Sequence, residues 1–151
     1  MIKRVLVAVD GSENSNRALD FALDLAEKYN ANVTVLNVSE SPAMGVVSLE
    51  PTEPMAYAGG TVDFYKDFHR FHEDILRKAV NRAREFKPNV TVSSKLREGN
   101  AASEIVAEAK EGAFDIIVVG HKGLGRVKEL FLGNISERVA HLAPCPVIIV
   151  R

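Results

Sequence analysis

Runs that consist mainly of β-branched or aliphatic residues occur at four places in the chain. These runs are RVLVAV near 4–9, NVTVLNV near 32–38, DIIVVG near 115–120 and PVIIV near 146–150. Because apolar and polar residues do not alternate within them, we expect strands that are buried on both faces, as in a parallel sheet covered by helices. A fifth run, NVTVSSKLRE near 89–98, does alternate and predicts a half-exposed strand at the sheet edge.

Between these runs the apolar spacing changes to that of a helix. Strands and helices therefore alternate along the chain. Right-handed crossovers would build one α/β domain over residues 1–151, a doubly wound, five-stranded parallel sheet with helices on both faces. We expect Ser12 or Asn14 to cap the first helix. The predicted core faces of the four helices are formed by Ala18, Ala22, Leu25 and Tyr29; by Phe64, Phe68, Phe71, Ile75, Ala79, Ala83 and Phe86; by Ile105, Val106 and Ala109; and by Ile135, Val139 and Leu142.

Charge and cysteine content limit the partners and the compartment. The formal net charge of -1 gives no general attraction to nucleic acid or to anionic lipid, so we expect neither as a partner. The apolar run that begins the chain reaches Asp10 too soon for a signal peptide or a membrane span. The single cysteine, Cys145, has no partner within the chain, which favours a reducing, cytoplasmic location.

Residues 120–136, GHKGLGRVKELFLGNIS, have the composition of a phosphate-binding loop. Glycines allow backbone N–H groups to approach a ligand closely, and the helix expected to follow would present further unpaired N–H groups and the positive end of its dipole. Two common phosphate motifs are absent. A P-loop would need lysine and a hydroxyl residue where Arg126 and Val127 stand, and a dinucleotide fingerprint would need glycine in place of Lys128.

The spacing that does fit is Gly120, two residues, Gly123, nine residues, Gly133 and then a small polar residue. It resembles the ATP-binding signature of the universal stress protein family. The similarity extends over nearly the whole chain outside 39–60 and the body of the second helix, through RVLVAVDGSENSNRALDFALDLA, VTVLNV, EGNAASEIVAEAKEGAFDIIVVGHKGLG and LGNISERVAHLAPCPVIIVR. It implies a domain with strand order 3-2-1-4-5 that binds an adenine nucleotide and forms a homodimer.

Carried over position by position, the resemblance implies a set of nucleotide contacts. Asp10 and the backbone around Val9 would contact the adenosine part, and the backbone of Val38 would lie near the adenine. The ribose and phosphates would be surrounded by Gly120, His121, Lys122, Gly123 and Arg126, and the phosphate tail would be held by Gly133, Asn134, Ile135 and Ser136. The ATP-binding form of the family usually has serine or threonine where Asn134 stands. An amide can donate to phosphate but replaces a metal-binding hydroxyl poorly, so ATP, ADP and AMP, with or without Mg²⁺, stay open as ligands.

Simpler interpretations compete at several of these positions. Asp10 could only cap the first helix or anchor a turn, and the spaced glycines could only permit tight turns. His121 has no ligand partner at metal spacing, so we expect it to offer a hydrogen bond, and we expect His69, His72 and His141 to be solvated or packed.

Three functions follow from these residues. The first is a cytoplasmic, regulatory ATP-binding homodimer with at most slow hydrolysis, because no paired carboxylates or catalytic triad accompany the loop. Its two copies would pair through the apolar edge strand near 146–151. The second is a dimeric stress-response interaction protein that binds no nucleotide. This alternative is suggested by Asn134, which stands where serine or threonine is usual. The third is an ATP- or AMP-handling enzyme, which DGSENS favours least because it lacks the paired glycines of pyrophosphatase-type loops.

Overall fold

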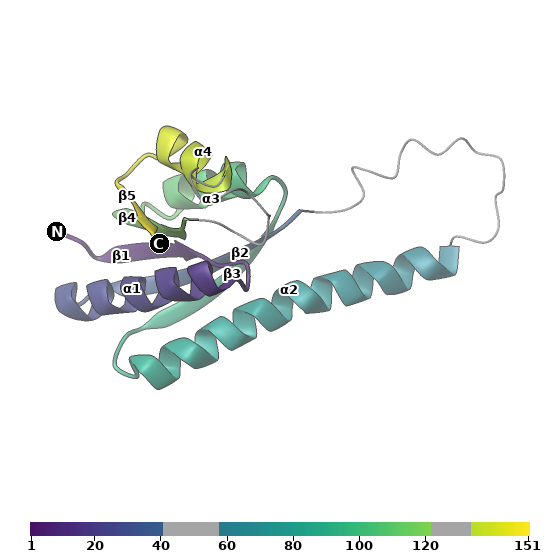
Figure 1. The fold of residues 1–151 in the computed structure, drawn as a ribbon, viewed down its shortest axis with the longest axis horizontal. Helices are drawn as coiled ribbons and strands as arrows, with labels where there is room; N and C mark the ends of the chain where they lie inside the picture. Colours follow the sequence, from purple (N-terminus) through teal and green to yellow (C-terminus); the bar gives the residue numbers. More distant parts are fainter. Residues whose placement is uncertain (41–57, 122–133) are drawn as a thin grey trace.

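The computed structural model describes residues 1–40, 58–121 and 134–151, and the side chains within 58–64 are not part of this description. Strands and helices alternate along the described chain, as the apolar pattern predicts (Figure 1). In order they are β1 (Arg4–Ala8), α1 (Glu13–Tyr29), β2 (Asn32–Ser39), α2 (Ala58–Phe86), β3 (Val92–Glu98), α3 (Ala101–Glu111), β4 (Ile116–Gly120), α4 (Asn134–Leu142) and β5 (Val147–Val150). None of the described helices is long and apolar enough to cross a membrane.

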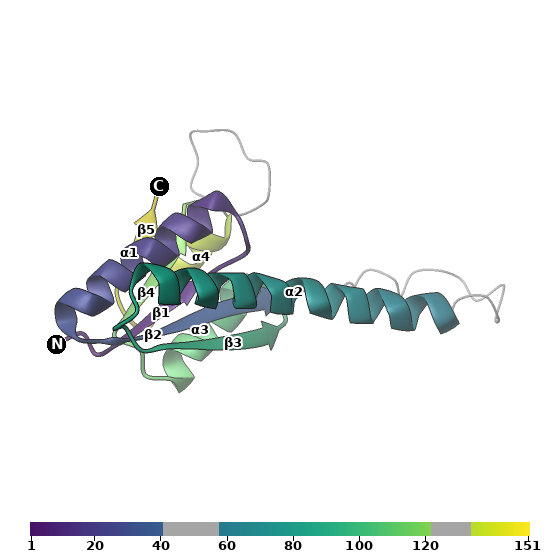
Figure 2. The ribbon, with the colours of Figure 1, turned by 90° about the horizontal axis from the view of Figure 1, so that it is seen from below.

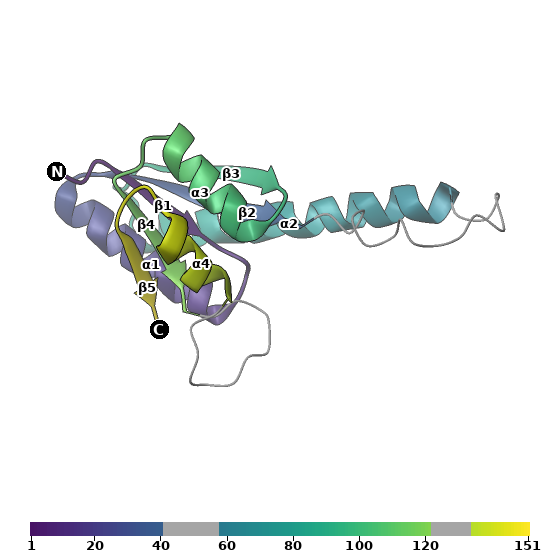
Figure 3. The ribbon, with the colours of Figure 1, turned by 90° about the horizontal axis from the view of Figure 1, so that it is seen from above.

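The sheet has the order β3-β2-β1-β4-β5 with all neighbours parallel, which confirms the predicted topology. Helices α1 and α2 cover one face of the sheet (Figures 1 and 2), and α3 and α4 cover the other (Figures 1 and 3). Each face of the sheet therefore packs against a separate apolar core. Val5 and Val7 point toward α1 and α2, whereas Leu6, between them, packs with Ile105 and Val139 of α3 and α4.

The predicted core faces are correct in the middle of the helices and wrong near several of their ends. Ile75, Ala79 and Ala83 of α2 are buried, but Phe71 is 53% exposed and Phe86 is 47% exposed. Tyr29 at the end of α1 and Ile135 and Leu142 near the ends of α4 are exposed as well. The amino-terminal part of α2 extends past the carboxyl ends of the strands (Figures 1 and 2), whereas Phe86 is exposed at the other end of this helix. Helical spacing identifies the apolar face but not how far the sheet continues beneath it.

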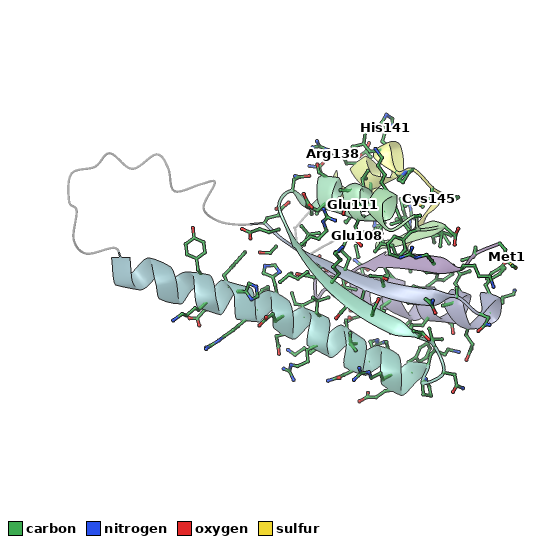
Figure 4. The ribbon with its side chains drawn as sticks, turned by 180° about the vertical axis from the view of Figure 1, so that it is seen from behind. Met1, Glu108, Glu111, Arg138, His141 and Cys145 are labelled. Atoms are coloured by element: carbon green, nitrogen blue, oxygen red, sulfur yellow. The ribbon has the colours of Figure 1, made fainter. Side chains whose placement is uncertain are left out.

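A charged cluster fastens the edge strand β3 to α3. Arg97 of β3 donates from Nε to Glu104 at 2.7 Å and from Nη1 to Glu108 and Glu111 at 2.8 Å each. Lys95 adds a contact of 2.7 Å from Nζ to Glu108. Burial favours the neutral form of Glu108, but the hydrogen bonds from Lys95 and Arg97 outweigh it and hold the pKa of this carboxyl below its ordinary value. Glu108 and Glu111 are labelled on α3 beside β3 in Figure 4.

Replacing Arg97 should destabilise the protein more than replacing its neighbour Lys95. Arg97→Met leaves the buried carboxylate of Glu108 with one cation and Glu104 with none from β3, so we expect a loss of about 1–3 kcal/mol in the free energy of unfolding. Lys95→Met removes an exposed contact to the same carboxylate and should cost less than about 1 kcal/mol. Urea denaturation of both variants measures the difference, and equal losses would contradict a central role for Arg97.

Candidate functional site

The predicted site residues that the structure describes lie near the carboxyl ends of the strands. From β1 the chain builds outward to β2 and β3 on one side and to β4 and β5 on the other. Parallel strands end at a common edge, and a crevice forms there where the strand order reverses. At or just beyond these strand ends, or at the start of α4, the structure places Val9, Asp10, Val38, Gly120, His121, Asn134, Ile135 and Ser136. The other predicted contacts, Lys122, Gly123, Arg126 and Gly133, lie outside the described residues.

The turn after β1 is held by its own polar side chains. Asp10 accepts from the backbone N–H of Ser12 through Oδ1 at 2.9 Å, and Ser12 accepts from the backbone N–H of Ser15 through Oγ at 3.2 Å. Ser12 is thus the cap of α1, one of the two predicted caps. Gly11 has φ +85°, and a Cβ there would lie 3.3 Å from Cγ1 of Ile75 in α2. The simpler interpretation of Asp10 as a residue that anchors a turn is therefore correct.

The end of β4 is packed against α1 and tied to α4. A Cβ at Gly120 would lie 2.9 Å from the carbonyl carbon of Asn14, so glycine is needed here for packing whether or not a ligand binds. His121 donates its backbone N–H to the carbonyl of Val150 at 2.7 Å. The hydroxyl of Ser136, which is 3% exposed, donates to the carbonyl of His121 at 3.1 Å. This bond fixes the first turn of α4 beside the end of β4, with Asn134 and Ile135 exposed.

A pocket of about 470 Å³ opens between the turn after β1 and α2. Its volume is within the usual range for small-molecule sites. Val9, Asp10 and Gly11 form one wall, and Phe71 and Lys78 of α2 belong to the other. Among the predicted site residues that the structure describes, Val9 and Asp10 line this pocket. Sequence analysis missed the α2 wall because it placed the aromatic residues of that helix in the core.

A buried chain of hydrogen bonds connects α2 to the end of β1. Asn37 of β2, 2% exposed, donates from Nδ2 to the carbonyl of Val9 at 2.6 Å. Nδ1 of His72 on α2 lies 2.6 Å from Oδ1 of Asn37. The rings of Phe68 and Phe71 meet the His72 ring edge-on, with centroids 4.7 and 5.3 Å away. His72 is packed, which is one of the two outcomes expected for it. Its polar partner, Asn37, could not be predicted from the sequence.

The surroundings of His72 lower its pKa below the ordinary value of 6.5. Burial is the main cause, and repulsion from His69 one turn earlier adds to it. The described residues contain no group of three or more histidine, cysteine, aspartate or glutamate side chains placed to hold a metal ion.

Strand ends, a glycine and the start of a helix meet where the strand order reverses, and the fold is that of a doubly wound α/β protein. The chain belongs to the universal stress protein family, whose family model matches residues 1–151. It is 34% identical over 152 aligned residues to universal stress protein YxiE of Bacillus subtilis, and the alignment covers 100% of both chains. The family predicted from the sequence is confirmed.

Solved structures of similar proteins contain adenine nucleotides. A universal stress protein in complex with cAMP has a TM-score of 0.71 and 26% identity to this chain, covering 99% of this chain and 97% of that one. A family protein from Arabidopsis thaliana with AMP bound has a TM-score of 0.66 at 20% identity, covering 98% and 90%. The protein from Archaeoglobus fulgidus in complex with dAMP has a TM-score of 0.69 at 19% identity, covering 100% and 98%. The last two show a shared fold.

Acid should destabilise the protein through His72 before it protonates the carboxylates. The folded pKa of His72 lies below the unfolded value, so its contribution to stability is complete above about pH 6.5 and is lost as the pH falls from there toward the folded pKa. We expect the free energy of unfolding in urea to decrease between pH 7.5 and pH 5.5. The decrease should be smaller in His72→Asn and unchanged in His141→Asn, a matched exposed histidine. An undiminished decrease in His72→Asn would assign the pH effect elsewhere.

Proposed function

We propose that residues 1–151 act as one nucleotide-binding domain, a cytoplasmic, regulatory universal stress protein that binds an adenine nucleotide, ATP in the first place. The observation that carries the proposal is the meeting of the turn at Asp10, the end of β4 at Gly120 and the start of α4 at the point where the strand order reverses. The adenine nucleotides in the complexes of similar proteins support the same class of ligand.

The start of α4 is the proposed phosphate end of the site. The first N–H groups of a helix have no partner within the helix and carry part of its positive dipole charge, so they attract an anion. Asn134 begins α4 and is exposed, and Ser136 holds this turn beside His121. A phosphate there would leave the adenosine part to reach toward Val9, Asp10 and Val38, in agreement with the contacts that the family resemblance implies.

Binding without fast hydrolysis is part of the proposal. Among the described contacts that the family resemblance implies, Asp10 is the one carboxylate, and it accepts the Ser12 N–H in the turn. Asp74 of α2 also lines the pocket, and it is paired with Arg77 and Lys78. A general base must reach the attacking water, and efficient phosphoryl transfer needs a positioned metal or cation beside it. Because no group of three or more metal-ligand side chains occurs among the described residues, we propose that any bound Mg²⁺ would be held chiefly by the phosphates.

The free edge of β5 is the proposed surface for a homodimer. The carbonyls of Pro146 and Val150 accept from β4, so the backbone groups of Val147 and Ile149 between them point away from β4. This edge lies at the end of the sheet order, and its residues are apolar and half-buried. An apolar strand with outward N–H and C=O groups readily pairs with a second copy across a two-fold axis.

Charge at the start of α4 should control ATP binding. Asn134→Asp puts a negative charge beside the proposed phosphate, and we expect it to weaken ATP binding by about tenfold or more. Asn134→Ser restores the residue usual in the family and should bind at least as tightly as wild type. Asn100→Asp is the matched control, because it places the same charge at the cap of another helix. This helix, α3, follows β3, which lies at the end of the sheet opposite to β5. Calorimetric titration with ATP, with and without Mg²⁺, gives each affinity.

Wild type that binds neither ATP, ADP nor AMP would overturn the proposed function. If Asn134→Ser then gained ATP binding, the dimeric interaction protein without nucleotide would replace it. Equal weakening by Asn134→Asp and Asn100→Asp would refute the phosphate position alone. Steady ADP formation that follows the protein through purification would instead identify an ATPase.

Sedimentation should find a dimer at micromolar concentration. Ile149→Pro removes one of the outward-facing N–H groups of β5 without removing a bond to β4, so we expect it to shift the protein toward monomer. Circular dichroism of the variant checks that the sheet is retained. A wild-type protein that sediments as a monomer, or an Ile149→Pro variant that stays dimeric, would contradict pairing through β5.

A further inference from the structure

His72 stands out among the buried residues of α2 because it is polar and has a specific partner. The residues around it on the core face, Ile75, Leu76 and Ala79, are apolar. Asn37 is likewise a polar residue within the apolar run of β2, and its side chain is fully buried. Two buried polar side chains on separate elements that bond to each other restrict how those elements can be arranged.

The direction of each hydrogen bond follows from the last acceptor in the chain. A backbone carbonyl can only accept, so the amide nitrogen of Asn37 must face Val9. The side-chain oxygen of Asn37 then faces His72, and because this oxygen also can only accept, Nδ1 of His72 must carry the hydrogen. The neutral imidazole is therefore held as the Nδ1–H tautomer, and the sequence of donors runs from His72 through Asn37 to Val9.

These bonds join the two backbone segments predicted to hold the adenosine. Val9 immediately precedes Asp10, and Asn37 immediately precedes Val38. The ladder between β1 and β2 has Ala8 and Leu36 as its last registered pair, followed by the bond from Val9 N–H to the Leu36 carbonyl at 2.8 Å. Beyond that point the Asn37 side chain holds the Val9 carbonyl. The Asn37 side chain thus adds one further hydrogen bond between the two strand ends, beyond the last bond of the backbone ladder.

We propose that His72 is a positioning residue of the nucleotide site: by donating to Asn37 it fixes the amide that holds the Val9 carbonyl, and so sets the distance between the Asp10 turn and the backbone of Val38. This proposal rests on the proposed function and extends it to α2, which contributes none of the predicted contacts. His72 acts on the adenosine end of the site. Its removal should therefore weaken ATP and AMP by the same factor, whereas Asn134→Asp should weaken ATP more than AMP.

The tautomer of His72 tests the geometry without any ligand. In ¹⁵N-labelled wild-type protein at pH 7.5, long-range ¹⁵N–¹H spectra of the histidine rings distinguish a protonated Nδ1 from a protonated Nε2. His72→Asn identifies the His72 signals by their disappearance. We expect the Nδ1–H form at His72. A neutral Nε2–H form would overturn the proposal, because Nδ1 could then not donate to Asn37.

Nucleotide affinity tests the positioning role. His72→Leu replaces the imidazole with an apolar side chain of similar size that has no donor. It should weaken the binding of both ATP and AMP by about threefold to tenfold, the effect of one hydrogen bond. His72→Asn returns an amide donor at the same number of bonds from the backbone as Nδ1 and should recover most of the affinity. His69→Leu, an exposed histidine one turn earlier, is the matched control and should bind as wild type does.

The outcomes separate the two proposals. Unchanged affinity in His72→Leu, or no recovery in His72→Asn when circular dichroism shows both variants folded, would overturn the positioning role while leaving nucleotide binding in place. A wild-type protein that binds neither ATP nor AMP would overturn the proposed function and, with it, this role of His72. The ring spectra would then still report whether the hydrogen-bonded chain exists.

Discussion

The burial of parallel strands on both faces governs the rest of this structure. A strand covered on both sides uses its backbone polar groups within the sheet, so groups that can meet a ligand are confined to the strand ends. Here five strands end at a common edge, and the reversal of order between β1 and β4 lies between the Asp10 turn and the end of β4, to which the start of α4 is bonded through Ser136. The burial that stabilises the fold therefore also determines where a site can form.

The sequence predicts burial better than it predicts partners. Continuous apolar runs located the strands to within a few residues. The expected burial on both faces is wrong for the last run, because it forms β5 at the end of the sheet, where all four residues are half-buried. Helical spacing placed Phe71 on the correct face of α2, but the spacing contains no information on where the sheet stops. Asp10 and Gly120 were found because they follow strands directly. Asn37 and His72 were not, because their contact joins positions 35 residues apart and neither belongs to a recognisable motif.

Polar groups in an apolar interface restrict the arrangement of the elements that contain them. Every buried side-chain nitrogen or oxygen in the described part of the chain has a hydrogen-bond partner, so Asn37 and His72 are accommodated without an orphaned group. An apolar contact tolerates small shifts of α2 over the sheet, whereas these hydrogen bonds do not, because a displaced donor would leave a buried acceptor unpaired. These hydrogen bonds thus define the position of α2 at the carboxyl ends of the strands, where Gly11 lies against Ile75.

The two outer strands of the sheet differ in how well they are protected against pairing with another sheet. β3 exposes Ser93, Ser94 and Lys95 and is fastened to α3 by Arg97, and charged or polar residues at an edge oppose pairing with another sheet. β5 is formed by valine and isoleucine alone, and its described neighbours include no comparable charged cluster. Edges built to stay monomeric are usually polar, so an apolar edge opposite a polar one favours self-association on one side of the sheet only. The proposed pairing through β5 would close after two copies, because each copy has one edge suited to it.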